Sequence, residues 1–118
     1  ANEEELLALY QTRDFAQAAD GVRRDAALAA VTRSEKGSVV VAGGETLEEP
    51  AAPVDAVVDA TGAGDQYAAG FLFGATHGLS LRESARLGHL AAAEVIQHLG
   101  PRPRTRLRDL ALAQGFRI

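Results

Sequence analysis

The chain has 118 residues, of which 47% are hydrophobic and 24% are charged, so it is long enough to fold as one globular unit with a modest core. It contains no cysteine, which excludes a disulfide framework and favours an intracellular, cytoplasmic setting. The β-branched block at residues 39–41 is far too short to span a membrane, and no signal-peptide pattern opens the chain. The net charge of −4 and the absence of Trp argue against a nucleic-acid-binding domain.

The first expected element is a helix that begins after Asn2. Asn2 can cap the free amides of this helix, and Glu5 stands three residues later, which is the spacing of a capping box. The apolar residues Leu6, Leu7 and Leu9 follow directly. Taken alone, this segment is an ordinary helix start.

Two strands are expected next, at residues 29–32 and 38–41, joined by a hairpin-like turn at residues 33–37. A further hairpin is expected across Gly43–Gly44, with its second strand at residues 45–47. Two prolines in the connector at residues 48–53 indicate an extended edge or loop rather than a domain linker, although this connector is the most probable break in the chain.

A strand at residues 54–58, a glycine-rich turn and a helix follow in close succession. Tyr67, Phe71 and Ala75 recur with the spacing of one helical face. At the junction, Gly62, Ala63 and Gly64 leave the backbone uncovered where helix amides lack partners and the helix dipole is positive, so an anion is favoured there. Asp65 in the first turn either caps the helix or faces the bound anion, and its position alone does not decide between these roles.

A long amphipathic helix is expected after residue 80, with one apolar stripe that packs on a core. His89 lies off this stripe and, by periodicity alone, faces solvent, as His77 and His98 are also expected to do. Four arginines at positions 102, 104, 106 and 108 indicate a solvated basic turn before a last helix. The members of the stripe are Leu81, Ala85, Gly88, Ala92, Val95, Ile96 and Leu99. Short strands interleaved with helices predict a layered α/β fold with parallel pairing and sites at the carboxyl ends of strands.

The string Asp59-Ala-Thr-Gly-Ala-Gly-Asp65, followed by Gln-Tyr-Ala-Ala-Gly-Phe-Leu, resembles the C-terminal signature of the ribokinase or PfkB family, which phosphorylates sugars and nucleosides. The resemblance implies that Asp65 is the base that deprotonates the acceptor hydroxyl. It also implies that Gly62, Ala63 and Gly64 form the anion hole for the migrating phosphoryl group. Phosphoryl transfer needs these parts because it depends on positioning and on stabilisation of charge on the phosphoryl oxygens.

Two further segments are similar to motifs of this family. Asn2-Glu-Glu-Glu5 resembles its Asn-x-x-Glu motif, which implies that Asn2 lies near the nucleotide phosphates and that Glu5 organises Mg²⁺ through water. Thr32, Ser34 and Gly37 match the place of its Thr-x-Gly-x-x-Gly motif at the ATP phosphates and ribose, with Ser34 in place of the first glycine. Without the flanking motifs, the second segment would be an ordinary β-turn.

The resemblance also assigns contacts around the nucleotide base and a monovalent cation. The string from Gly88 to Ala93 is similar to the family segment that lines adenine, which places His89 and Ala92 beside the base. A K⁺ ion beside the anion hole is implied near Asp59 and Thr61, together with backbone carbonyls near Val95 and Gly100.

The resemblance covers essentially the whole chain but only the C-terminal portion of a family member. It implies a ribokinase-like layered α/β/α fold (Rossmann-like), with residues 1–118 as its C-terminal nucleotide-binding and catalytic part. The expected activity of the parent protein is ATP- and Mg²⁺-dependent phosphorylation of a hydroxyl on a sugar or nucleoside, of the adenosine-kinase or ribokinase type. An exposed sheet edge is expected to make a lone fragment self-associate, for example as a homodimer, or to leave it poorly stable.

Two other functions remain open. The chain as it stands can be a nucleotide-binding fragment that lacks the acceptor site and does not turn over. A dinucleotide-binding oxidoreductase is less well supported, because no Gly-x-Gly-x-x-Gly follows a strand and no ribose-binding acid stands at the expected distance.

Overall fold

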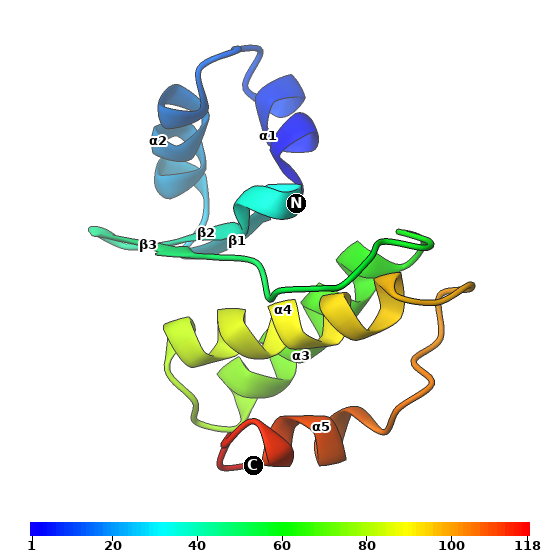
Figure 1. The fold of residues 1–118 in the computed structure, drawn as a ribbon. Helices are drawn as coiled ribbons and strands as arrows, with labels where there is room; N and C mark the ends of the chain where they lie inside the picture. Colours follow the sequence, from blue (N-terminus) through cyan, green and yellow to red (C-terminus); the bar gives the residue numbers. More distant parts are fainter. The chain divides into compact units, whose positions relative to one another are not determined.

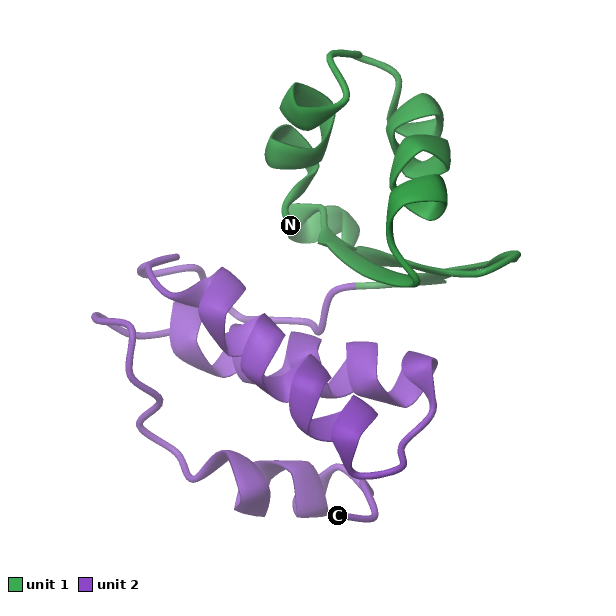
Figure 2. Ribbon diagram, turned by 180° about the vertical axis from the view of Figure 1, so that it is seen from behind, with its two compact units in different colours: residues 1–50 green, residues 51–118 purple.

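The computed structural model describes all 118 residues, which form two compact units. Unit 1 comprises residues 1–50 and unit 2 comprises residues 51–118 (Figure 2). Composition had suggested one globular unit, and this expectation is wrong. The boundary falls inside the proline-containing connector at residues 48–53, where a break was expected, so the expectation that this connector is not a domain linker is wrong.

Unit 1 opens with helices α1 (Glu3–Leu9) and α2 (Phe15–Asp25). The expected capping box is present, because the Glu5 amide donates to Asn2 Oδ1 at 2.8 Å and the Asn2 amide donates to Glu5 Oε1 at 2.9 Å. The helices pack through Leu6 and Ala18 onto Val31 of the sheet, and these three side chains form the buried centre of this unit.

A three-stranded sheet completes unit 1 (Figure 1). Its strands are β1 (Leu28–Thr32), β2 (Ser38–Ala42) and β3 (Glu45–Glu49), and a short 3₁₀ turn, η1 (Ser34–Lys36), lies between the first two. Both expected hairpins are confirmed, since β1 pairs with β2 and β2 pairs with β3 in antiparallel register.

The prediction of parallel pairing is wrong for these strands. Parallel neighbours need a crossover of a dozen or more residues, whereas residues 33–37 and 43–44 supply only tight turns. One parallel contact exists as an isolated bridge between Asn2 and Thr32, which ties the start of the chain to the end of β1.

Unit 2 is helical, with α3 (Ala63–Thr76), α4 (Leu81–Ile96) and α5 (Leu107–Ala113). Tyr67 and Phe71 of α3 are buried, as their spacing predicted. Glycine allows the backbones of α3 and α4 to approach closely, because a Cβ added at Gly70 would lie 2.7 Å from the carbonyl oxygen of Leu87. A Cβ added at Gly88 would lie 2.8 Å from the carbonyl oxygen of Tyr67.

The predicted strand at residues 54–58 is not formed, and residues 51–60 contain neither helix nor strand. A strand needs a partner, and all strands of this chain lie between residues 28 and 49. The amides of Val58 and Asp59 instead donate to the Ile96 carbonyl at 2.8 and 3.1 Å. Val57 and Val58 remain 62% and 54% exposed.

The apolar stripe of the long helix is confirmed in part, since three of its seven members are buried and Leu81, Ala92 and Ile96 are half-buried. Ala85, Gly88 and Val95 are buried in α4, but Leu99 lies beyond the end of the helix and is 70% exposed. Residues 101–106 form no helix or strand, and the four arginines at positions 102, 104, 106 and 108 are exposed before and within α5, as expected. None of the helices combines the length and apolarity needed to cross a lipid bilayer.

Candidate functional site

The start of α3 exposes backbone amides. Gly62 is the N-cap residue with φ of 82° and ψ of 1°, a left-handed conformation that glycine adopts without strain. A Cβ at this position would also lie 2.7 Å from Pro101 Cβ. Ala63 N donates to Ala60 O at 3.1 Å, whereas the amides of Gly64 and Asp65 find no acceptor within the chain. A positive helix end with uncovered amides is a binding site for an anion.

Asp65 lies in the first turn of α3 and is exposed to solvent. The N-cap residue Gly62 has no side chain, and no hydrogen bond joins the Asp65 carboxylate to the helix amides, so Asp65 has no capping role. Its carboxylate therefore stands next to the uncovered amides and is accessible to a reacting group.

Asp59 ties the glycine turn to the loop that follows α4. Its Oδ1 accepts a hydrogen bond from the Thr61 amide at 2.9 Å, and its Oδ2 accepts one from the Gly100 amide at 3.0 Å. Hydrogen bonding by the Thr61 side chain, and then by the amides of Gly100 and Thr61, lowers the pKa of Asp59 to about 2. Asp59 is therefore ionised at neutral pH and holds the turn before α3 in place.

The chain offers oxygen donors for cations rather than a dense ligand cluster. No three His, Cys, Asp or Glu side chains converge anywhere in it. Glu5 is exposed, and its Oε1 already accepts the Asn2 amide, so Glu5 could supply one oxygen to a cation. Mg²⁺ fits such a site because it keeps several waters and takes few protein carboxylates. A monovalent cation fits the turn at Asp59 and Thr61 only with the help of backbone carbonyls.

In unit 1, the structure brings together the residues that match the two nucleotide motifs. The bridge between Asn2 and Thr32 places the first helix start beside the end of β1, and the Thr32 amide donates to Ala1 O at 3.0 Å. An ion pair between Arg33 and Glu3, with 3.2 Å between Nη2 and Oε1, reinforces this contact. The hydrogen bond from Arg33 lowers the pKa of Glu3.

The turn after β1 needs two residues in the left-handed region. Ser34 has φ of 54° and Gly37 has φ of 92°, and the Arg33 amide closes the turn by donating to Gly37 O at 2.7 Å. Ser34 thus adopts a backbone conformation that favours glycine, at the position where the related motif has glycine.

Two of the three histidines differ from what periodicity suggested. His89 is 6% exposed and packs edge-on against the Tyr67 ring, with 5.0 Å between ring centroids, so the solvent-facing assignment is wrong. His98 is also not solvent-facing, because its side chain is 10% exposed and its Nε2 lies 2.9 Å from Glu94 Oε1. His77 is exposed and stacks on Phe73. Ala92 is half-buried on α4.

Sequence reasoning missed Glu94, a buried carboxylate at the C-terminal end of α4. It is 8% exposed and accepts hydrogen bonds from the loop after this helix. The available signal was a lone charge within the small and apolar run at residues 91–96. Such a charge is rarely buried without partners.

The predicted site residues therefore fall into two groups, one in each unit. Asn2, Glu5, Thr32, Ser34 and Gly37 belong to unit 1. The group in unit 2 comprises Asp59, Thr61, Gly62, Ala63, Gly64, Asp65, His89 and Ala92.

Comparison with known proteins settles the family. The model of the pfkB family carbohydrate kinases matches residues 1–106. The chain belongs to the PfkB family. A cytidine kinase of Thermococcus kodakarensis is 41% identical over 102 residues, which are 84% of this chain and 36% of that protein.

Solved structures of PfkB proteins share the fold of this chain. The crystal structure of adenosine kinase from Sinorhizobium meliloti matches with a TM-score of 0.95 and 54% identity, over 97% of this chain and 35% of that one. A ribokinase of Arabidopsis thaliana, solved with ribose and ATP, matches with a TM-score of 0.85 and 28% identity over 98% of this chain and 40% of that one. The chain is thus a mixed α/β structure that spans about a third of the length of the relatives it matches.

Proposed function

We propose that this chain is the C-terminal nucleotide-binding and catalytic part of a kinase that transfers a phosphoryl group from ATP to a hydroxyl of a sugar or nucleoside. The observation that carries the proposal is the start of α3, where uncovered amides of Gly64 and Asp65 stand beside an exposed carboxylate. The matched relatives are sugar and nucleoside kinases, which supports the same class of reaction.

In this proposal the amides at the start of α3 bind the migrating phosphoryl group. Charge that develops on the phosphoryl oxygens is stabilised by fixed backbone dipoles that need no reorganisation. Gly62 and Gly64 allow the close approach, since neither presents a side chain to the anion. The Ala63 amide is held by Ala60 O, so Ala63 contributes through its place in the turn.

Asp65 is the general base of the proposed reaction. Its carboxylate accepts the proton of the acceptor hydroxyl as the oxygen attacks the terminal phosphorus of ATP in line with the leaving ADP. The negative charges of the phosphoryl group and of Asp65 are kept apart in this arrangement. The phosphoryl oxygens face the amides, and the acceptor hydroxyl faces the carboxylate.

The remaining predicted site residues are assigned to the nucleotide and its cations by their motif positions, in each unit by itself. Asn2, Thr32, Ser34 and Gly37 contact phosphates and ribose, and His89 and Ala92 line adenine. Glu5 would hold Mg²⁺, which would neutralise charge on the phosphates. Asp59 and Thr61 would supply oxygen ligands to K⁺. This part of the proposal rests on motif positions and on the oxygen donors described above.

A nucleoside is the preferred acceptor, because the adenosine kinase of S. meliloti is 54% identical and the cytidine kinase of T. kodakarensis is 41% identical to this chain. The test is an assay of acceptor-dependent ADP release by the protein in which residues 1–118 occur, purified at its native length, with ATP and Mg²⁺. Adenosine, cytidine, ribose and fructose are compared with a blank that lacks acceptor.

We expect ADP release that depends on acceptor and is fastest with a nucleoside. Release with a sugar alone would keep the kinase and overturn the nucleoside preference. ATP binding without release for any acceptor would favour the alternative function, a nucleotide-binding module without an acceptor site.

A further inference from the structure

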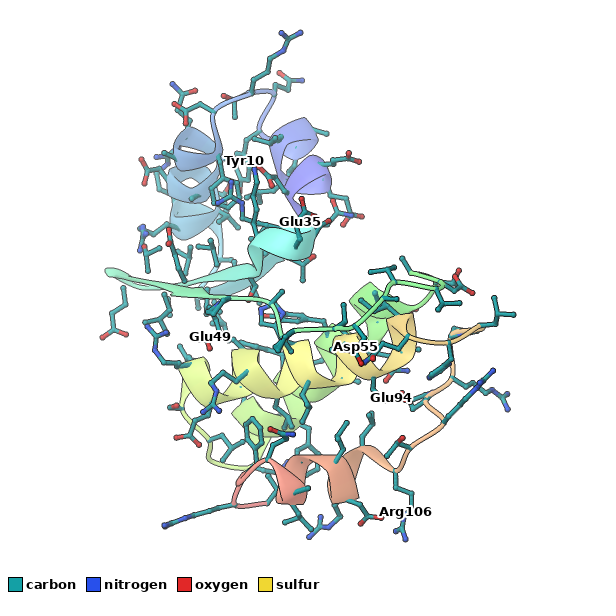
Figure 3. All side chains as sticks on the ribbon, in the orientation of Figure 1. Tyr10, Glu35, Glu49, Asp55, Glu94 and Arg106 are labelled. Atoms are coloured by element: carbon teal, nitrogen blue, oxygen red, sulfur yellow. The ribbon has the colours of Figure 1, made fainter.

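Glu94 is the least expected charged group of unit 2, because its carboxylate lies inside the unit and not at its surface. Its side chain is 8% exposed, and it stands near the C-terminal end of α4 on the side of the loop that leads to Arg106 (Figure 3). Burial of a carboxylate is costly unless hydrogen bonds compensate it. The burial of the Glu94 carboxylate therefore needs compensating contacts or a function.

Three donors converge on one oxygen of Glu94. Oε1 accepts hydrogen bonds from the amide of Arg104 at 3.0 Å and from the amide of Thr105 at 3.3 Å, and His98 Nε2 lies 2.9 Å away. The other oxygen, Oε2, is buried and accepts no hydrogen bond from the chain. Through its Oε1 atom, Glu94 thus joins α4 to His98 at the start of the loop at residues 98–105 and to Arg104 and Thr105 at its end.

The same loop contacts the start of α3. The Gly100 amide donates to Asp59 Oδ2 at 3.0 Å, and Gln66 Nε2 donates to Pro101 O at 3.3 Å. Pro101 also lies against Gly62, where an added Cβ would come within 2.7 Å of Pro101 Cβ. The loop at residues 98–105 therefore packs against the glycine turn and holds it in place.

We infer that Glu94 is a positioning residue for the phosphoryl-binding amides at the start of α3, and that it acts through the loop at residues 98–105. Glu94 is ten residues from Arg104 along the chain and touches neither Asp65 nor Gly62–Gly64 in its hydrogen bonds. Glu94 acts through packing and hydrogen bonds and does not contact the reacting groups. It fixes the loop, the loop contacts Asp59 and Gly62, and these two residues position the uncovered amides of Gly64 and Asp65. The inference about turnover rests on the proposed kinase function, whereas the inference about the loop does not.

The first arm of the test measures amide hydrogen exchange by NMR in the chain of residues 1–118. In Glu94→Ala, the amides of Gly100 and Thr61 should exchange at least about tenfold faster, since the loop loses charge-assisted hydrogen bonds. Neither amide is bonded to Glu94 itself, so faster exchange there reports transmission through the loop. Glu83→Ala is the matched control, because Glu83 lies on the same helix and is exposed.

The conservative variant Glu94→Gln separates the hydrogen bonds from the bulk of the side chain. Its carbonyl can replace Oε1 as acceptor, and its amide nitrogen takes the place of Oε2, which has no donor beside it. We expect exchange at Gly100 and Thr61 within about threefold of the parent chain. If Glu94→Ala does not fold, Glu94→Asp replaces it, because the shorter side chain withdraws the acceptor from the loop and keeps the charge.

The second arm measures turnover at native length. Glu94→Ala should lower kcat about 10- to 100-fold, because misplaced amides lose transition-state stabilisation, while the KM for ATP changes less than about threefold. Glu94→Gln should restore most of kcat. If the unsubstituted protein of native length shows no turnover, the kinase proposal is contradicted. The hydrogen-exchange measurements alone then test the role of the loop. Unchanged exchange at Gly100 and Thr61 in Glu94→Ala, or in Glu94→Asp, would overturn the inference.

Discussion

At the scale of single residues, the backbone conformation of Ser34 and the hydrogen bonds of Asp59 both affect stability. Ser34 occupies the left-handed region with φ of 54°, and Asp59 accepts amide hydrogen bonds on both of its oxygens. Substitution of either residue should change stability in a way that does not depend on catalysis.

Replacing Ser34 by glycine should stabilise unit 1. A side chain in the left-handed region costs about 1–2 kcal/mol, and part of the gain is lost because glycine is freer in the unfolded chain, so we expect a net gain of about 0.5–1 kcal/mol. Urea unfolding monitored by circular dichroism measures the change. Glu35 lies in the same turn but does not have a positive φ, so Glu35→Gly is the control and should lower stability. A loss of stability in Ser34→Gly would contradict the proposed strain at Ser34.

Asp59 should make unit 2 sensitive to acid. Its pKa is about 2 in the folded chain against an ordinary value of 3.8, so the unfolded state binds the proton more tightly. The stabilisation is present above the ordinary pKa and is lost as the pH falls through about 2. The free energy of unfolding should therefore fall less between about pH 4.5 and pH 2.5 in Asp59→Asn than in the parent chain. Equal pH dependence of the two proteins would show that Asp59 is not held in this way.

At the scale of secondary structure, the close approach of α3 and α4 depends on glycine. An added Cβ at Gly70 would lie 2.7 Å from Leu87 O and 2.9 Å from Gly88 Cα, both of which belong to the backbone and cannot move aside. Gly70→Ala should therefore destabilise unit 2 by about 1–3 kcal/mol in urea unfolding.

Gly64→Ala is the control for this prediction, because it lies in the same helix and an added Cβ meets nothing within 4 Å. It should be neutral or stabilising by up to about 1 kcal/mol, since alanine is the better helix former. Similar effects of the two substitutions would mean that the helices can separate at little cost.

The elements that sequence reasoning predicted well are those with local signals. The capping residues Asn2 and Glu5, the hairpin at Gly43–Gly44 and the helix carrying Tyr67 and Phe71 are all present, because caps, turns and periodicity act within a few residues. The strand at residues 54–58 failed because an apolar run becomes a strand only beside another strand. His89 and Glu94 could not be placed, since their burial depends on which helices and loops pack around α4.

At the scale of the whole chain, two small units with exposed apolar side chains should self-associate. Val57 and Val58 are 62% and 54% exposed on a segment that is neither helix nor strand, and they present apolar surface to another chain. Sedimentation velocity of residues 1–118 should show association that rises with concentration. Thr substitution at both valines should weaken it. A monodisperse monomer at all concentrations would contradict this prediction.

Substitution of Asp65 separates phosphoryl transfer from ATP binding, because Asp65 has one chemical step in the proposed reaction. Asp65→Asn keeps the shape of the side chain but cannot accept the hydroxyl proton. We predict that kcat for phosphoryl transfer at native length falls about 10²- to 10⁴-fold while the affinity for ATP stays within about threefold. Asp55→Asn, at an exposed residue earlier in the same unit (Figure 3), should retain parental turnover. Near-parental kcat in Asp65→Asn would contradict the assignment of the base and, with it, the proposed role of the α3 start in catalysis.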